Sequence, residues 1–345
     1  MAERKAIRLG SVVRTNVSTY SEKEGWAFVN YLDTGNITQD TISEIQRINV
    51  GTDKLPSRAR RKVQIGNIIY STVRPNQLHY GFIKSQPDNF LVSTGFAVID
   101  VNEKEAVPEY IYYFLTHRDV TERLQAIAEQ STSAYPSIKP SDIEDLTIDL
   151  PPIEEQRKIV GLLKMLDGKI KQNTEINNNL TEQARSIYQS WFIDYEPFGR
   201  TMPLDWIPSS LGGVATMKTD SWSPSKNPET IVEHYSIPAY DEKHYPVFEI
   251  ASGIKSNKYI LTPDSVMISK LNPDTKRIWR PMCLSAHPIC STEFIVYEAK
   301  KAAQKDFVYS ILDSAPFLNF LCSHTTGSTN SRQRATPKAT LDFPI

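Results

Sequence analysis

The chain has 345 residues, of which 40% are hydrophobic and 23% are charged, and its formal net charge is −1 with a pI near 6.6. This is an ordinary globular composition, and the length is about twice that of a typical domain of roughly 150 residues, so two domains and a connector are expected. The nearly neutral charge excludes nucleic-acid binding through the field of the whole molecule, so any such binding must come from local basic clusters.

Cysteine usage and the amino terminus bear on the cellular compartment. The cysteines, Cys283, Cys290 and Cys322, lack the paired close spacing of a disulfide framework or a zinc site. The first ten residues carry charges and no apolar stretch of secretory length, and no later run approaches about 18 apolar residues. We therefore expect a cytoplasmic protein with reduced thiols and no membrane contact.

Residues 1–150 are expected to form a first domain of the α+β class. Apolar, strand-like runs, such as those around Val73 and over 97–101, alternate with an amphipathic helical segment that begins near Glu109. A Ser/Thr-rich loop, 131–137, precedes Pro140 near the end of the domain. This mixture of strands with one or two helices is the α+β pattern.

Two clusters of cationic and amide side chains in this domain are candidates for DNA contact. Lysine and arginine bind phosphates, whereas Arg, Asn, Gln, Ser and Thr contact base edges. The candidates are, in a predicted basic loop, Arg58, Arg60, Arg61 and Lys62, and, near a strand turn, Arg74, Asn76, Gln77 and Lys84. An equally good interpretation of any one cluster is a solvated surface loop.

The connector, residues 151–196, contains the strongest helical segment of the chain. Pro151-Pro152 followed by Glu154-Glu155 is a good helix start, and the pattern continues to Phe192. Apolar residues recur in strict 4-3 alternation, interrupted by Asn173 and Asn177, as in a coiled-coil seam. A solvated spacer helix is the alternative, but such a seam needs a partner to cover it. The seam residues expected to dock a partner are Ile159, Leu163, Leu166, Ile170, Leu180, Ile187 and Trp191.

Residues 197–345 repeat the first domain. Leu9-Gly10-Ser11-Val12 recurs as Leu211-Gly212-Gly213-Val214, and the other matches follow in the same order at offsets between 197 and 202 residues. They are 73–76 with 271–274, 93–96 with 291–294, 109–112 with 306–309, and Pro140-x4-Asp145 with Pro337-x4-Asp342. A duplicated unit fixes the architecture: two repeated α+β domains separated by a long, coiled-coil-forming helix.

The second domain offers its own candidate DNA contacts. The candidates are Lys270, Lys276, Arg277 and Arg280 around Trp279, and, after a Ser/Thr-rich loop, Arg332, Gln333, Arg334 and Lys338. A different pattern in the same region, Asp264, Asp274 and Lys276, has the residue types of a PD-(D/E)xK-like nuclease site that binds Mg²⁺. We disfavour a nuclease because such short patterns are common and the counterpart segment, 66–78, lacks every member.

The run Leu150-Pro151-Pro152-Ile153-Glu154-Glu155-Gln156-Arg157-Lys158-Ile159-Val160 and the ending Trp191-Phe192-Ile193-Asp194-Tyr195 closely resemble the central conserved region of type I restriction-modification specificity subunits. The resemblance extends over essentially the whole chain. It implies two target recognition domains, each reading half of a bipartite DNA sequence, around a helix that docks the modification subunits.

The resemblance also implies that the chain carries no catalytic residue, cofactor or metal. S-adenosylmethionine, ATP and Mg²⁺ would be used by the modification (methyltransferase) and restriction (translocase and nuclease) subunits. The sequence agrees, since it contains neither an Asn/Asp-Pro-Pro-Tyr/Phe element nor a phosphate-binding G-x-x-x-x-G-K-[ST] loop.

One departure from the family pattern concerns a second conserved helix, which the family places after the second domain. By the internal repeat, Asp342 to Ile345 correspond to Asp145 to Ile148, so the counterpart of the helix that starts near Leu150 is absent from this sequence. We therefore expect the seam of the central helix to drive self-association, with two chains paired in antiparallel fashion.

Overall fold

The computed structural model describes residues 5–132, 135–326 and 333–345. The chain divides into two compact units, Met1–Asn173 and Thr174–Ile345. The long helix α4, Ile153–Tyr188, spans the boundary between them and ends in a π-helical turn, Gln189–Ile193. The predicted division into 1–150, 151–196 and 197–345 instead counts the helical connector as a separate segment. This division stays a prediction.

The first unit contains two four-stranded sheets and three short helices. One sheet, the helix-packed sheet, has the order β2-β11-β8-β9, and the other, the outer sheet, has the order β6-β3-β10-β7. The bounds are β1 Lys5–Arg8, β2 Val13–Thr15, β3 Phe28–Leu32, β4 Ile37–Thr38, β5 Thr41–Ile42, β6 Gln46–Asn49, β7 Ala59–Lys62, β8 Ile68–Ser71, β9 Tyr80–Phe82, β10 Phe90–Ser93, β11 Phe96–Val101, α1 Pro108–Leu115, α2 Arg118–Glu129, α3 Pro140–Glu144 and β12 Thr147–Leu150.

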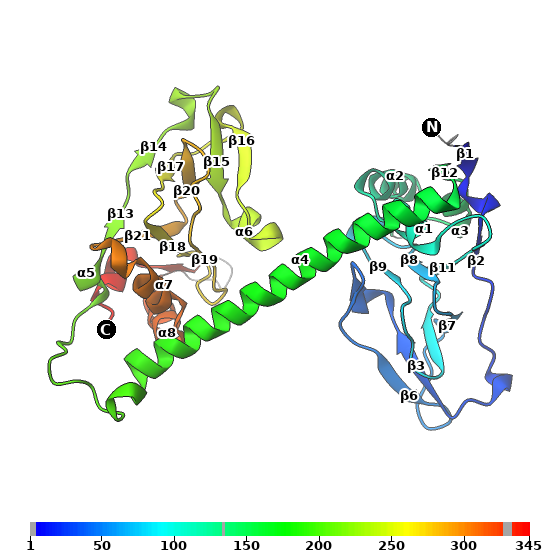
Figure 1. The fold of residues 1–345 in the computed structure, drawn as a ribbon, viewed down its shortest axis with the longest axis horizontal. Coiled ribbons are helices and arrows are strands. Elements are labelled where there is room, and N and C mark those ends of the chain that lie inside the picture. The colour runs from blue at the N-terminus through cyan, green and yellow to red at the C-terminus, as the bar shows by residue number, and fades with distance from the viewer. Residues whose placement is uncertain (1–4, 133–134, 327–332) are drawn as a thin grey trace. The chain divides into compact units, whose positions relative to one another are not determined.

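Three apolar layers hold the first unit together. Side chains of α1 to α3 pack on one face of the helix-packed sheet, with Leu115 and Leu124 fully buried. A second layer, which includes Ile69 and Phe96, joins the two sheets, and a third, which includes Tyr31 and Ile48, covers the far face of the outer sheet. In Figure 1, α1, α2 and α3 accordingly gather at one end of the unit and β3 and β6 lie at the other. Burying apolar faces in layers is how α+β domains are stabilised.

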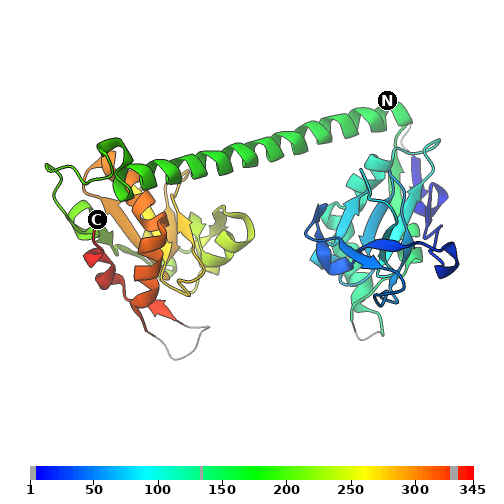
Figure 2. The same cartoon turned by 90° about the horizontal axis from the view of Figure 1, so that it is seen from below.

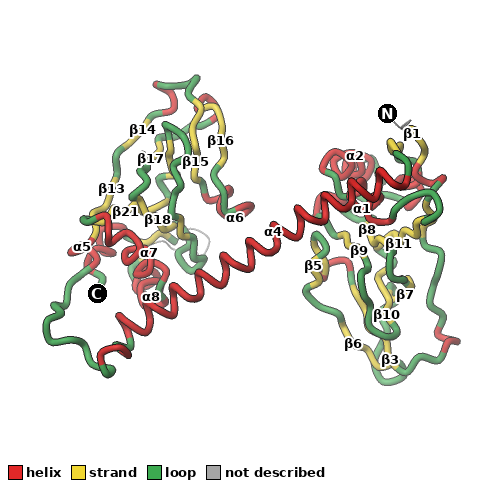
Figure 3. Tube along the Cα trace, in the orientation of Figure 1, coloured by secondary structure: helices red, strands yellow, loops and turns green. Residues whose placement is uncertain are grey.

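The second unit repeats the order of both sheets and adds β14 to its outer sheet, and in Figure 3 its helices α7 and α8 lie apart from the outer strands, whereas α6 lies beside β15 and β16. Its helix-packed sheet has the order β13-β21-β18-β19 and its outer sheet the order β14-β17-β20-β15-β16. The bounds are α5 Leu211–Val214, β13 Ala215–Lys218, β14 Ser221–Trp222, β15 Ile231–Tyr235, α6 Ile237–Lys243, β16 Val247–Ile250, β17 Lys258–Ile260, β18 Ser265–Ser269, β19 Ile278–Trp279, β20 Pro288–Ser291, β21 Phe294–Ala299, α7 Lys305–Asp313, α8 Ala315–Ser323, β22 Thr325–Thr326 and β23 Arg334–Ala335.

Matching strand pairs and hydrogen bonds confirm the repeat. In each outer sheet one pair is parallel, β3 with β10 in the first unit and β15 with β20 in the second. The backbone N–H of Leu9 donates to the carbonyl oxygen of Leu146 at 2.7 Å, and that of Leu211 donates to Phe343 at 2.8 Å. The expected fold, two α+β units and a long helix, is therefore confirmed.

Candidate nucleic-acid interface and docking helix

A strained turn occupies the same place in both units. Arg74 has a left-handed backbone, with φ of 49°, and its equivalent Asn272 has a φ of 47°. Both residues are followed by proline, which fixes the next φ. Left-handed residues other than glycine cost energy and gather at functional sites, so the turn after β8 and the turn after β18 are the first places to look for binding.

Each strained turn is held by the segment that follows the second helix of its unit. The N–H of Arg74 donates to the carbonyl oxygen of Pro136 at 2.9 Å, and the N–H of Asn272 donates to that of Gln333, also at 2.9 Å. A bridge between Val73 and Ser137 has its counterpart in one between Leu271 and Arg334. Figure 2 shows how α8 leads away from α4 to β22 in the second unit. We call these two pairs of segments, 71–78 with 135–138 and 269–277 with 333–335, the first and second turn clamps.

The first turn clamp presents polar and aromatic groups to solvent. The guanidinium carbon of Arg74 lies 4.8 Å from the ring centre of Tyr135, which places the cation over an exposed aromatic face. The side chains of Asn76 and Gln77 are exposed at the next two non-proline positions. Arginine, asparagine and glutamine are the side chains that make paired hydrogen bonds to guanine and adenine edges.

The cations at 58–62 were predicted to form a basic loop, but most of them lie on a strand. Ala59–Lys62 is strand β7, paired with β10. Arg60 lies 2.9 Å from the carboxylate of Glu22, and Lys62 pairs with Glu24, which lowers the pKa of that carboxyl. Arg61 is partly buried, and this burial lowers the pKa of its guanidinium. Arg58 is exposed at the start of the strand. The run of four cations suggested a loop, but carboxylates from a distant turn neutralise two of them.

Most of the other candidate cations also form intramolecular ion pairs. The pairs are Lys84 with Asp40, Arg277 with Asp241 at 2.6 Å, Arg280 with Asp306, Lys276 with Asp313 at 2.7 Å, and Arg334 with Glu293 at 3.0 Å. Lys270 and Gln333 are partly exposed, Lys338 is exposed, and Arg332 lies outside the described residues. Exposed ion pairs are weak, so a phosphate can compete for the exposed cations Lys84, Arg280 and Arg334, whereas Lys276 is held by a buried carboxylate. The role of all these residues in DNA contact stays a prediction.

Two of the three residues of the possible nuclease site, Asp274 and Lys276, make other contacts. The Oδ1 atom of Asp274 accepts a hydrogen bond from the N–H of Thr275 at 2.9 Å, which is the role of a turn residue. Lys276 is held by Asp313, and Asp264 is exposed in the turn before β18. Within the described parts of the chain, no group of three His, Cys, Asp or Glu side chains could hold a metal ion.

The helix α4 exposes a stripe of apolar side chains. Among the predicted seam residues, Leu166, Ile170, Leu180, Ile187 and Trp191 are exposed, while Ile159 and Leu163 are partly buried. Three more exposed side chains widen the stripe, with Leu162 at 56%, Met165 at 67% and Ile176 at 47%. The 4-3 pattern left these three out because they lie beside the seam. An exposed apolar stripe of this kind marks an interaction surface.

Another face of α4 holds the helix on each unit. In the first unit, Gln156 is fully buried and its Oε1 accepts the N–H of Val107 at 2.8 Å, while Lys164 pairs with Glu109 of α1 at 2.6 Å. The phenol of Tyr113 donates to Asp167 at 2.5 Å. These contacts leave the exposed stripe uncovered, so the helix is seated on this unit through side chains outside the stripe.

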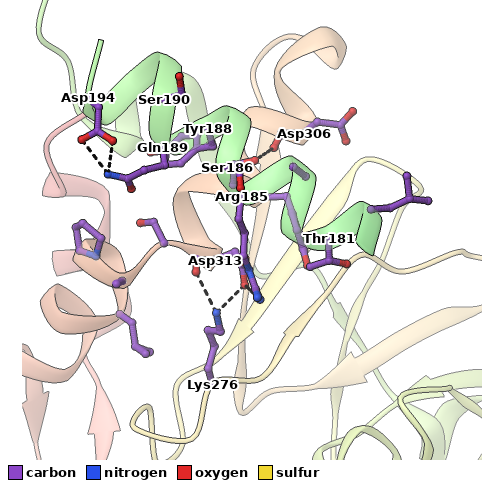
Figure 4. A pocket seen from close by; sticks show the side chains of 18 of the residues that line it. Thr181, Arg185, Ser186, Tyr188, Gln189, Ser190, Asp194, Lys276, Asp306 and Asp313 are labelled. Atoms are coloured by element: carbon purple, nitrogen blue, oxygen red, sulfur yellow. Dashed lines mark hydrogen bonds and ion pairs between the residues drawn. The ribbon is translucent and has the colours of Figure 1, made fainter. Parts of the chain in front are cut away.

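In the second unit the carboxyl-terminal half of α4 packs on α7, the counterpart of α1. Tyr188 and Phe192 contact Phe307, with ring centres 6.0 and 4.8 Å apart, and burial raises the pKa of Tyr188 to about 12. Arg185 forms a bidentate pair with Asp313. Between this part of α4 and the α7–α8 corner lies a groove of about 1010 Å³, and Figure 4 shows Arg185 and Lys276 converging on Asp313 in it.

Sequence reasoning missed several residues of this region. Tyr135 carried no signal, because only the fold brings it to Arg74. Asp313 is a buried carboxylate, but the equivalent residue of the first unit is Thr116. Comparison of the two repeats therefore did not mark this position.

Comparison with known proteins now bears on this geometry. Residues 7–182, just over half of the chain, match the family model described as the type I restriction modification DNA specificity domain. The chain belongs to this family. It is 32% identical over 197 residues to the type I restriction enzyme HindI specificity subunit of Haemophilus influenzae, an alignment that covers 57% of this chain and 42% of that protein.

Other specificity proteins are also similar. The type I restriction enzyme MjaIX specificity subunit of Methanocaldococcus jannaschii is 26% identical over 251 residues, covering 68% of this chain and 56% of that protein. A crystal structure of the type I restriction-modification system S subunit from M. genitalium shares the fold, with a TM-score of 0.54 and 15% identity over 99% of this chain and 84% of that one. The chain thus spans about half the length of the two curated specificity subunits.

The helices also bear on the membrane question. Across residues 5–132, 135–326 and 333–345, no helix has both the length and the apolar content that crossing a bilayer requires.

Proposed function

We propose that this chain is the DNA-sequence-recognition subunit of a type I restriction-modification system and that it supplies no catalytic group of its own. The observation that carries the proposal is the match of residues 7–182 to the type I DNA specificity domain, in a chain whose two units repeat the same turn clamp. Each predicted domain, 1–150 and 197–345, reads one half of a bipartite duplex target, and the connector 151–196 holds the partners.

A methylome experiment tests the reading of two half-sites. The chain is produced with its modification subunits in a host that lacks other methyltransferases, and the methylated motif is determined by sequencing. Replacing residues 13–140 by the equivalent domain of a relative should change one half of the motif and leave the other intact. A swap that changes both halves, or neither, would contradict separate reading.

The isolated chain should neither methylate nor cleave DNA. Both activities require the modification and restriction subunits, which use S-adenosylmethionine, ATP and Mg²⁺. Incubation of the purified chain with cognate DNA and Mg²⁺ should leave the DNA intact. Cleavage that disappears in Asp274→Ala would contradict the proposal and would favour the nuclease.

The exposed stripe of α4 is the proposed docking surface for the modification subunits. The double variant Leu166→Asp/Ile170→Asp should abolish co-purification with them, because two charges would be buried at an apolar interface. Lys171→Asp, an exposed change on the other side of the helix, is the matched control and should bind normally. Retention of normal stoichiometry by the double variant would show that the partner docks elsewhere.

Without its partners the same stripe should pair two chains. Antiparallel pairing places Asn173 and Asn177 near the crossing, where polar side chains can satisfy each other. Sedimentation of the purified chain at micromolar concentration should therefore show self-association, and the Leu166→Asp/Ile170→Asp variant should be monomeric. A soluble wild-type monomer under these conditions would contradict this pairing.

A further inference from the structure

Asp313 is a buried carboxylate at which three segments of the second unit meet. It is the last residue of α7, and its side chain is only 6% exposed. The Nε atom of Arg185, on α4, lies 2.5 Å from Oδ2, and Nη2 lies 3.1 Å from Oδ1. The Nζ atom of Lys276, in the second turn clamp, lies 2.7 Å from Oδ1 and 3.0 Å from the carbonyl oxygen of the same residue.

The electrostatics favour an ionised Asp313. Burial by itself raises the pKa of this carboxyl, but the hydrogen bonds from Arg185 and Lys276 outweigh it and leave the pKa below its usual value. The carboxyl end of α7 adds a partial negative charge that also attracts the lysine ammonium. Two cations therefore share one desolvated anion, and loss of that anion would release both of them.

Lys276 lies in the short loop that follows the second strained turn. Thr275, next to this lysine, donates its N–H to the carbonyl oxygen of Asn272 at 3.0 Å, and the N–H of Asn272 is held by Gln333 at 2.9 Å. Directly after Lys276, the carbonyl of Arg277 accepts the N–H of Ser269 at 2.9 Å. The loop is short and its backbone is hydrogen-bonded on both sides of Lys276, so the position of this residue is tied to that of the turn.

The first unit is built differently at the equivalent positions. Thr116 stands in the place of Asp313 and Leu78 in the place of Lys276, so neither charge is present. There α4 is held through Glu109 and Tyr113 of α1. The carboxylate link between α4 and a turn clamp is therefore a feature of the second unit.

We propose that Asp313 is a positioning residue that couples the seating of α4 to the conformation of the second turn clamp. A partner docked on α4 thereby stabilises the turn that reads the second half-site, whereas the first half-site is read without this link. The coupling rests on the proposed function. In this proposal the ammonium of Lys276 binds the carboxylate of Asp313 and does not contact a DNA phosphate.

The test uses the chain in complex with its modification subunits and three DNA duplexes: the methylated motif of the wild type, and that motif with one base pair changed in either half. Asp313→Asn should lower the preference over the duplex changed in the second half by roughly tenfold, the scale of one base contact, and leave the preference over the other duplex unchanged. Asp306→Asn, on the same helix but in the exposed pair with Arg280, is the matched control and should behave as the wild type.

Further variants separate positioning from mere stability. Lys276→Met should reproduce the selective loss, and combining it with Asp313→Asn should add little, whereas Asp313→Glu should restore part of the preference. Equal loss for both halves, no loss, or the same loss in Asp306→Asn would overturn the coupling. So would a variant that melts at a lower temperature but keeps its preference. A wild-type complex that prefers no DNA sequence would overturn the proposed function itself.

Discussion

The two units share a backbone plan but fill the far face of the outer sheet with different chemistry. In the first unit this face carries Tyr31, Ile48 and Ala59 in an apolar cluster. The strand registers place His234, Glu249 and Lys258 at the three equivalent positions of the second unit. Nδ1 of His234 lies 2.7 Å from Glu249, and Lys258 is buried with its amine bound by Ser256. This face of the sheet thus accepts charged side chains at these three positions, while Val232 and Ile289 on the same face stay in an apolar cluster.

This difference shows which features belong to the shared architecture. The turn clamps, the parallel strand pair and the helix-packed sheet recur in both units, although few of their side chains are identical. The outer face has diverged in polarity, as expected where only local packing and charge compensation must be satisfied. Features kept on both sides are therefore the better candidates for a shared role in binding.

The largest effect is expected from placing the second unit's charge in the first unit. Ile48→Glu would bury a carboxylate in an apolar cluster whose neighbouring lysine, Lys62 over Trp26, is already paired with Glu24, and should destabilise the first unit by about 3 kcal/mol. Ile48→Val, which only removes a methylene, should cost about 1 kcal/mol and is the control. Chemical denaturation of the full chain measures both. Near-equal stability of the two variants would mean that this face is open to solvent.

A smaller effect is expected at the turn shared by both units. Arg74→Ala should weaken discrimination in one half-site by about 1 to 3 kcal/mol, the range of a paired hydrogen bond to a base. Asn272→Ala should act on the other half-site. Arg123→Ala, an exposed arginine of α2, is the control. Binding of the complete complex to duplexes altered in either half measures this, and uniform weakening across all sequences would assign Arg74 to a phosphate.

The smallest effect is a pH dependence confined to the second unit. Burial lowers the pKa of His234, and although the hydrogen bond to Glu249 opposes this, the pKa stays below its ordinary value. The unfolded chain then binds the proton more readily than the folded one, so stability falls as the pH drops below about 6.5, the unfolded value, toward the folded pKa.

Hydrogen exchange can locate that pH dependence in the intact chain. After correction for intrinsic rates, peptides from 231–250 should lose protection between pH 7.5 and 5.5, whereas those from 28–49 should not. His234→Gln should remove the difference. Equal changes in both units, or persistence of the effect in this variant, would assign the pH dependence to other groups.

The sequence by itself determined the repeat, the α+β class and the long helix. Each of these rests on local patterns: the proline and glutamates that start α4, its apolar alternation, and motifs that return after about 200 residues. Such patterns can be recognised along the chain without knowledge of the fold. The exposed seam residues Leu166 and Ile170 were found in this way.

The tertiary structure decided which charges are available and what the turns contact. Glu22 lies 38 residues from Arg60, and Asp313 lies 128 residues from Arg185, so no local pattern could pair them. The stacking of Arg74 on Tyr135 likewise needs two loops brought together by the sheet. Ion pairing acts through space over a few ångströms, whereas the sequence records only distance along the chain. For this reason the sequence could not show which cationic residues are paired with carboxylates and which are not.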